Sequence, residues 1–165
     1  MMRLLITKES KYRFPFAAGM IAAAIMLGVS GFSSSGLCGE SPAKTAVSSE
    51  EPAVLEAARK YFDAEVARDL PAVYRCLAPS SVYCATHDYE AFLAEAHASP
   101  VRIVGYKIVR IAHIRNNEDF KGFPHVEKFA YVEVDIVVHY TDKNEKADVN
   151  IGFTFIKERG KWYKG

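Results

Sequence analysis

The chain has 165 residues, half of them hydrophobic, and its 21 basic and 20 acidic residues nearly cancel. No long run of one charge appears, which excludes the basic face typical of nucleic-acid-binding proteins. The 12% aromatic content argues against general disorder, and the residues that follow Cys38 are enough for one domain with a real core but not for two.

The first informative segment is residues 14–39, which contain no charged residue and follow four basic residues and one acidic residue. Its first part is apolar, and its second part is rich in Ser and Gly. The order basic, apolar, small-polar is typical of an export signal, with the positive flank on the cytoplasmic side. We therefore expect a protein exported across the inner membrane, either periplasmic or secreted.

The end of this segment allows three interpretations. Small residues at 33–36 suit signal peptidase, whereas a lipoprotein would carry its lipid on Cys38 but needs an aliphatic residue earlier than Leu37. A retained anchor needs about 20 apolar residues, close to what residues 14–32 supply. The expected organisation is a signal peptide or N-terminal membrane anchor at 1–38, a Ser/Ala/Pro-rich flexible tether at 39–51 and a folded domain at 52–165.

The sequence leaves the oxidation state of two cysteines open. Without Cys38, the pair Cys76 and Cys84 remains in an oxidising compartment, where either a disulfide or two buried thiols is compatible with the spacing. Adding His87 to this pair matches no standard zinc pattern. We expect no metal and no cofactor.

Three helices are expected in the first half of the domain. Ser49, two acids and Pro52 begin the first, whose apolar positions recur at spacings of three and four. A short helix at 71–78 ends at Pro79, and Asp88 caps a third that runs to about Ala98. The apolar stripe of the first helix comprises Val54, Leu55, Ala58, Tyr61, Phe62 and Val66.

The second half reads as strands. Residues 101–115 are rich in Val and Ile, and their alternation slips near Gly105, as a bulge would cause. After a polar loop at 116–125, residues 129–140 and 147–157 alternate apolar and polar residues. A tight turn with Gly160 then leads into a short strand at 162–164.

The apolar residues of the two central strands must share one face, which restricts the register of their pairing. We expect a loop at 142–145, with pairs Thr141–Lys146, Val138–Val149, Ile136–Ile151 and Val134–Phe153 on this basis. On the other face, His139 would lie opposite Asp148 and Glu133 opposite Thr154. We interpret the His139–Asp148 pair as a solvated ion pair and not as a catalytic pair. The apolar face of these two strands would then carry no carboxylate, because the outer face holds Glu133, Asp135, His139 and Asp148.

Helices followed by a long-stranded antiparallel sheet predict an α+β fold. Residues 56–82, EAARKYFDAEVARDLPAVYRCLAPSSV, and 149–165, VNIGFTFIKERGKWYKG, resemble the opening and the closing hairpin of nuclear transport factor 2-like domains. The resemblance implies N-terminal helices packed on a strongly curved antiparallel sheet, with a cone-shaped apolar pocket between them. The family contains isomerases, dehydratases and cyclases together with binding domains, so the fold does not decide the function.

Two function classes follow. The first is an exported, non-catalytic domain that binds a small apolar ligand or a protein partner in the cone, with a homodimer through the sheet as one form of partner. The second is a pocket enzyme that performs acid/base chemistry on a hydrophobic substrate. A buried ionisable group in the cone would distinguish them, and the predicted faces favour binding. We place His87 and His97 on the surface. The inward-pointing ligand-binding candidates are Tyr61, Tyr74, Tyr106, Tyr140 and Trp162.

Overall fold

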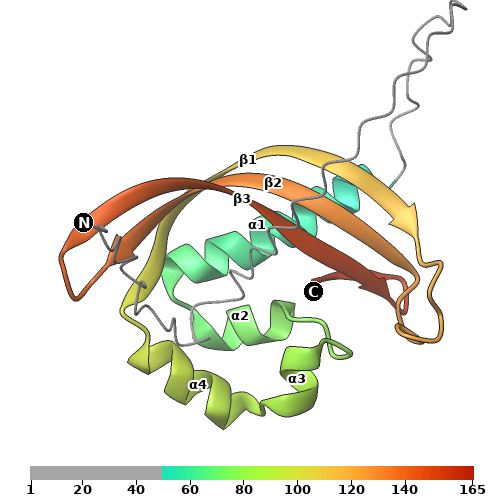
Figure 1. The fold of residues 1–165 in the computed structure, drawn as a ribbon, viewed down its shortest axis with the longest axis horizontal. Helices are drawn as coiled ribbons and strands as arrows, with labels where there is room; N and C mark the ends of the chain where they lie inside the picture. Colours follow the sequence, from blue (N-terminus) through green and yellow to red (C-terminus); the bar gives the residue numbers. More distant parts are fainter. Residues whose placement is uncertain (1–49) are drawn as a thin grey trace, which may run out of the picture.

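The computed structural model describes residues 50–165, and the predicted signal or anchor, with nearly all of the tether, lies outside them. In the described part, helices precede an antiparallel sheet, and Figure 1 shows the long strands bending over the helices. The architecture is therefore α+β, as predicted. The elements are α1 (Glu51–Ala67), α2 (Leu70–Cys76), α3 (Val82–Thr86), α4 (Tyr89–Ala98), β1 (Val101–Asn116), β2 (Lys128–Tyr140), β3 (Glu145–Glu158) and β4 (Lys161–Lys164).

Local signals set the helix boundaries. Glu50, and not the expected Ser49, occupies the N-cap position of α1. Arg68 is the C-cap residue after Ala67; its backbone is left-handed (φ 55°), and its N–H donates to the carbonyl of Glu65 at 3.1 Å. Asp69 then caps α2 by accepting from Ala72 N at 3.0 Å. The predicted Asp88 cap of α4 is confirmed by its 2.8 Å bond from Ala91 N.

The short helix α3 was not predicted, because Val82–Thr86 follows Pro79 and has no apolar period of its own. Ser81 caps it by accepting from Cys84 N at 3.2 Å. The described chain therefore has one helix more than expected, and α3 connects α2 to α4.

The sheet order is β1-β2-β3-β4, with all pairs antiparallel. The bulge predicted near Gly105 is confirmed by a register shift between Ile103 and Gly105. Arg159 and Gly160 both have positive φ, which is the two-residue turn expected between β3 and β4.

The faces of β2 and β3 are as predicted, but the register is wrong by two residues. Ile136 lies opposite Val149 and not Ile151, and His139 lies opposite Lys146 and not Asp148. A shift of two keeps every side chain on its face, so the hydrophobic pattern alone could not detect it. The turn decides the register, because Asn144 adopts the left-handed conformation (φ 53°) that Asn tolerates well.

The core lies between α1 and the inner face of the sheet. Phe62 packs edge-on against Phe153 at 4.8 Å between ring centroids, and Tyr61 packs against Phe155 at 6.5 Å. Val66, expected on the buried stripe, is 41% exposed, and Ala64 is buried instead. No helix of the described residues is long and apolar enough to cross a membrane.

Candidate functional site

The five aromatic residues predicted to bind a ligand do not converge on one pocket. Tyr61 is buried in the core, and its hydroxyl donates to Glu65 Oε1 at 2.7 Å. Tyr106 stacks on Phe62 at 5.0 Å, and its hydroxyl donates to Asp63 at 2.7 Å. Burial, together with that carboxylate, raises the pKa of Tyr106 to about 12. Both tyrosines therefore pack against Phe62, Tyr61 as a buried core residue and Tyr106 as a partly buried residue at the edge of the core.

The other three aromatic residues lie elsewhere. Tyr74 belongs to the helical layer, where its hydroxyl donates to the carbonyl of His87 at 3.4 Å. Trp162 lies near the start of α1, and its indole N–H donates to Glu50 at 3.1 Å. Tyr140 is the last residue of β2 and pairs with Val101. Of the five, Tyr61 alone takes part in the ionisable cluster described next.

The last turn of α1 places a carboxyl group among buried residues. Glu65 follows Tyr61 by one helical turn and accepts a hydrogen bond from its hydroxyl group. Burial raises the pKa of Glu65 above its ordinary value of 4.5, although the Tyr61 hydrogen bond and the charge of Arg68 act in the opposite direction. Burial also raises the pKa of Tyr61 well above 10, so the phenol remains a hydrogen-bond donor.

Lys164 brings a cation to the same region from β4. It is only 4% exposed, and its ammonium lies 5.9 Å from the centroid of the Phe153 ring. Burial lowers the pKa of Lys164 to about 8, while the charge of Glu65 partly restores it. The two groups therefore interact through their charges in an apolar setting, where perturbed pKa values mark candidate functional sites.

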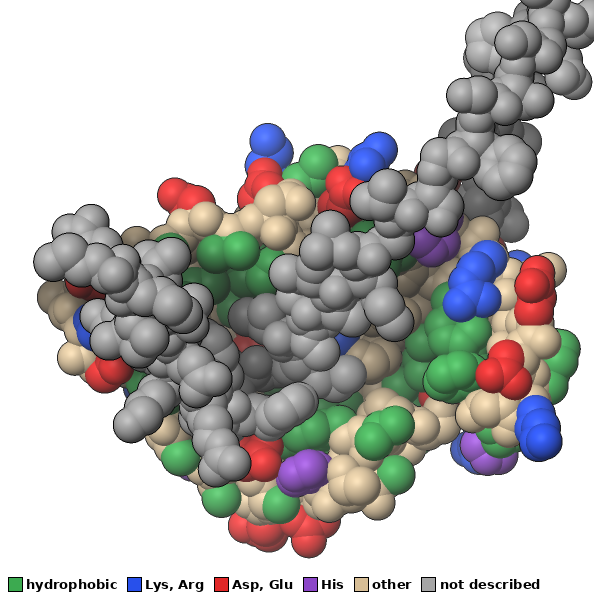
Figure 2. Space-filling model, in the orientation of Figure 1, with side chains coloured by type: hydrophobic (Ala, Val, Ile, Leu, Met, Phe, Trp, Pro, Cys, Tyr) green, Lys and Arg blue, Asp and Glu red, His purple; other side chains and the backbone are tan. Residues whose placement is uncertain are grey.

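An apolar strip continues from this cluster along the inner face of β3. Phe153 is 2% exposed, Ile151 is partly buried and Val149 is 36% exposed, so cover by the helices decreases toward the β2–β3 turn. Figure 2 shows hydrophobic side chains between the sheet and the helices on this face, with charged side chains around the rim. We call Tyr61, Glu65, Lys164, Phe153, Ile151 and Val149 the interior site.

Sequence reasoning missed the two charged members of this site, although each had a signal. Glu65 lies four residues after Tyr61 and three after Phe62, on the buried side of α1. Lys164 lies two residues after Trp162, so strand alternation gives it the same face. Neither Glu65 nor Lys164 was predicted as a site residue, because charged side chains are rarely buried.

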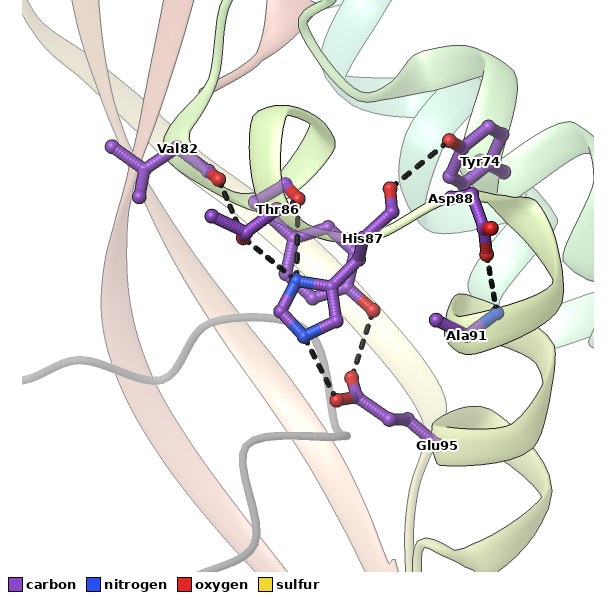
Figure 3. A network of polar contacts seen from close by, with 8 residues as sticks. Tyr74, Val82, Thr86, His87, Asp88, Ala91 and Glu95 are labelled. Atoms are coloured by element: carbon purple, nitrogen blue, oxygen red, sulfur yellow. Dashed lines mark hydrogen bonds and ion pairs between the residues drawn. The ribbon is translucent and has the colours of Figure 1, made fainter.

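A second polar cluster joins α3 to α4 (Figure 3). His87 Nε2 lies 3.2 Å from Glu95 Oε1, and Tyr83 donates to the other oxygen of Glu95 at 2.8 Å. His87 Nδ1 lies 2.9 Å from the Thr86 hydroxyl and 3.3 Å from the carbonyl of Tyr83. His87 is thus partly buried and not a simple surface residue, whereas His97 is exposed as expected.

This arrangement of Thr86, His87 and Glu95 looks like a nucleophilic triad, but its hydrogen bonds fit another role. The carboxylate of Glu95 only accepts, so a neutral His87 carries its proton on Nε2 and leaves Nδ1 as an acceptor beside the Thr86 hydroxyl. The Thr86 hydroxyl, however, donates to the carbonyl of Val82 within α3 at 2.8 Å. The contacts of Glu95 with His87 and Tyr83 hold α3 against α4.

The remaining candidates offer less. Cys76 and Cys84 are both free thiols, the first buried and the second partly exposed, and burial raises the pKa of Cys76. Within residues 50–165, no group of three His, Cys, Asp or Glu residues could hold a metal ion. An open groove of about 570 Å³ beside α1 and α2 mixes both signs of charge over alanines. Its lining is Glu56, Arg59, Lys60, Asp63, Ala64, Ala67, Asp69 and Ala72.

The outer face of the sheet carries the polar residues expected there. Arg110 and Glu133 form a two-bond ion pair at 2.7 and 2.9 Å, and Asn150 donates to Asp135 at 2.7 Å. His139 contacts Asn144 at 3.2 Å instead of Asp148. The predicted His139–Asp148 pair is therefore wrong, because the register of β2 and β3 separates the two residues.

Comparison with known proteins gives no further guide, since no protein-family model and no curated protein matches the chain.

Proposed function

We propose that this chain is an exported, non-catalytic domain of the nuclear transport factor 2-like type that binds a small, largely apolar molecule in a cone-shaped pocket at the interior site. Two features support the family: the resemblance of residues 56–82 and 149–165, and the α+β order of the elements. The charge-free segment at 14–39 behind basic residues supports export, with cleavage, lipidation at Cys38 and retention as its alternative outcomes.

One observation carries the proposal: a partly buried carboxyl group, that of Glu65, lies at the end of a partly exposed apolar strip. Binding sites for small molecules are mostly apolar and contain a few polar groups that fix orientation. Here Ile151 and Val149 offer apolar contact, and Glu65 offers a hydrogen-bonding group whose orientation Tyr61 fixes. The geometry fits a molecule with a hydrocarbon body and one hydrogen-bond-donating head group.

Two ligands with the same tail distinguish the contribution of the head group to binding from that of the tail. Dodecylamine and dodecanol share an apolar tail, and calorimetric titration of the exported protein below micelle concentrations measures the affinity of each. We expect both to bind at one site and the amine to bind more tightly. Glu65→Gln should remove that preference, since a hydrogen bond to a charged group contributes about 1.5–3 kcal/mol. Glu56→Gln, an exposed change on the same helix, is the matched control.

The outcomes are distinct. If neither compound binds saturably, the ligand-binding proposal is wrong. If both compounds bind and Glu65→Gln and Glu56→Gln show the same preference for the amine, the apolar strip binds the ligand but Glu65 does not contact the head group.

The second candidate is an acid/base enzyme acting on a hydrophobic substrate. The observation that favours it is the opposite displacement of two pKa values, upward for Glu65 and downward for Lys164. Such an enzyme would exchange the α-hydrogens of an apolar ketone in heavy water, which mass spectrometry detects. Glu65→Gln should abolish any exchange that the site catalyses.

A protein partner or a homodimer through the sheet remains part of the proposal. Apolar side chains on the outer surface of the sheet support it, because they leave apolar area in contact with solvent. They are Val104, Val109 and Tyr131, which are 37%, 46% and 36% exposed. Sedimentation of the exported protein distinguishes a monomer from a dimer.

A further inference from the structure

We propose that the loop between β1 and β2 docks on a lipid bilayer surface. Residues 117–127, which we call the Phe loop, project from the end of the sheet where β1 finishes (Figure 1). Phe120 is 65% exposed and Phe123 is 47% exposed. No other phenylalanine of the described chain is among the exposed large hydrophobic residues. Exposed aromatic residues of this kind mark contact surfaces.

The Phe loop is ordered, so the exposure of its aromatic residues is built into the fold. The Asn117 side chain, 3% exposed, donates to the carbonyls of Phe123 and Val126 at 2.8 and 2.9 Å. Its oxygen accepts from Asp119 N at 2.9 Å, and Asp119 in turn accepts from Gly122 N at 2.8 Å. One buried amide therefore fixes the loop, with Phe120 largely exposed and Phe123 half exposed and packed edge-on against Phe129 at 5.4 Å between ring centroids.

The charged residues near the two rings include both signs. Lys121 lies between Phe120 and Phe123 in the sequence, and the adjacent β3–β4 turn adds exposed Arg159 and Lys161. That turn is tied to the loop, since Gly160 N donates to Glu127 at 2.8 Å. Three exposed carboxylates of the loop, Glu118, Asp119 and Glu127, balance these three basic residues. Aromatic residues beside basic ones are typical of segments that lie in the headgroup region.

The position of Glu50, the first described residue, points to the same occupant. The Glu50 carboxylate binds Lys128 at 3.0 Å and Lys157 at 2.8 Å, and Lys128 directly follows the Phe loop. Residues 1–49 therefore join the domain at the end that carries the loop. Residues 33–49 span at most about 60 Å when extended, so a membrane anchor at 14–32 would keep this end of the domain within that distance of the bilayer.

This inference rests on the alternative of the proposed function in which residues 14–32 are retained as a membrane anchor, and the experiment tests the two separately. The full chain is reconstituted into phosphatidylcholine vesicles containing phosphatidylglycerol, and flotation first shows whether it binds them. Phe120→Trp is then compared with Val104→Trp, a matched exposed position near the opposite end of β1. The parent chain, whose single tryptophan is the 9% exposed Trp162, supplies the background emission.

We expect the Phe120→Trp emission to shift to the blue and to be quenched by lipids with brominated acyl chains, while Val104→Trp stays unquenched. Flotation with equal, unquenched emission from both variants would overturn the loop proposal and leave the anchor in place; the ring would then face solvent or a protein. A full chain that does not float with vesicles would overturn both the anchor and the proposal.

Discussion

The two ends of α1 each present a glutamate, and their surroundings give them opposite properties. At the N-terminal end, Glu50 accepts hydrogen bonds from Lys157, Lys128 and Trp162, which lower its pKa from 4.5 to about 2. At the C-terminal end, burial raises the pKa of Glu65, whose nearest donor is the neutral hydroxyl of Tyr61. One carboxylate is held by cations, and the other lies among apolar residues.

This difference separates a carboxylate that stabilises the fold from one that is a candidate for binding or chemistry. Glu50 ties the start of α1 to β2, β3 and β4, so its charge stabilises the fold. Glu65 carries a cost of burial that the fold itself does not require. Buried ionisable groups of the second kind are candidates for binding or chemistry, and the predictions below test whether the two ends differ as described.

The largest effect is expected at the core beside Glu65. Phe153→Ala should destabilise the domain by about 2–5 kcal/mol, because it removes the ring that packs between Phe62 and Lys164. Ile136→Ala should cost a similar amount. His139→Ala, which removes one contact on the outer face, should cost less than about 1 kcal/mol. Thermal melts of the three variants measure this, and a larger loss from His139→Ala would show that the faces are reversed.

Glu50→Gln should have the next largest effect. It removes the charged partner of Lys128 and Lys157 and should lower the free energy of unfolding by about 1–2 kcal/mol. A lowered pKa stabilises the fold above the unfolded value and loses this contribution as the pH falls. Urea unfolding should therefore show the difference at pH 7 and lose it between about pH 4.5 and 2. A difference that persists in acid would mean that the charge of Glu50 is not its source.

Glu65→Gln should change stability less, and in the opposite direction. The raised pKa means that ionisation of Glu65 opposes folding, so the fold loses stability as the pH rises from 4.5 through the folded pKa. A neutral amide avoids this cost. At pH 7 the free energy of unfolding of the variant should therefore equal that of the parent or exceed it by up to about 1 kcal/mol. The same unfolding experiment decides it, with Glu50→Gln as the opposite case. A clear loss would class Glu65 with Glu50 as structural.

The smallest effect concerns the thiol nearest to the interior site. Cys76 is buried and Cys84 is partly exposed, so alkylation of the folded protein should label Cys84 first and Cys76 only on unfolding. Mass spectrometry without reductant follows both thiols. A mass lower by two hydrogens would show the disulfide that the sequence left open, and equal labelling rates would mean that the interior is accessible.

The sequence predicted the architecture better than the site, for a physical reason. Alternation along β2 and β3 assigns faces because one face is apolar, but it cannot distinguish registers that differ by two. Asn144 carried the missing information, since its left-handed backbone places the turn one residue earlier than expected. Helix α3 lacked any periodic signal, so its existence depends on tertiary packing.

The interior site was harder to predict because its two charged members break the rule that charges stay outside. Glu65 and Lys164 each follow the period of their element into the core, yet their residue types argue for the surface. The five aromatic candidates pack in or against the core, Tyr61 and Trp162 buried and the other three partly buried, and they do not line one pocket. For Glu65 and Lys164, the position within the helix or strand period therefore predicted burial better than the residue type did.

The most direct test is to measure both carboxyl pKa values in the folded protein. Carbon-13 NMR titration of the glutamate side chains gives them, with Glu50→Gln and Glu65→Gln assigning the two resonances. We predict that Glu50 titrates near pH 2 and that Glu65 titrates above 4.5. A Glu65 pKa at or below 4.5 would mean that its carboxyl group is solvated or paired like that of Glu50, and it would contradict the interior site.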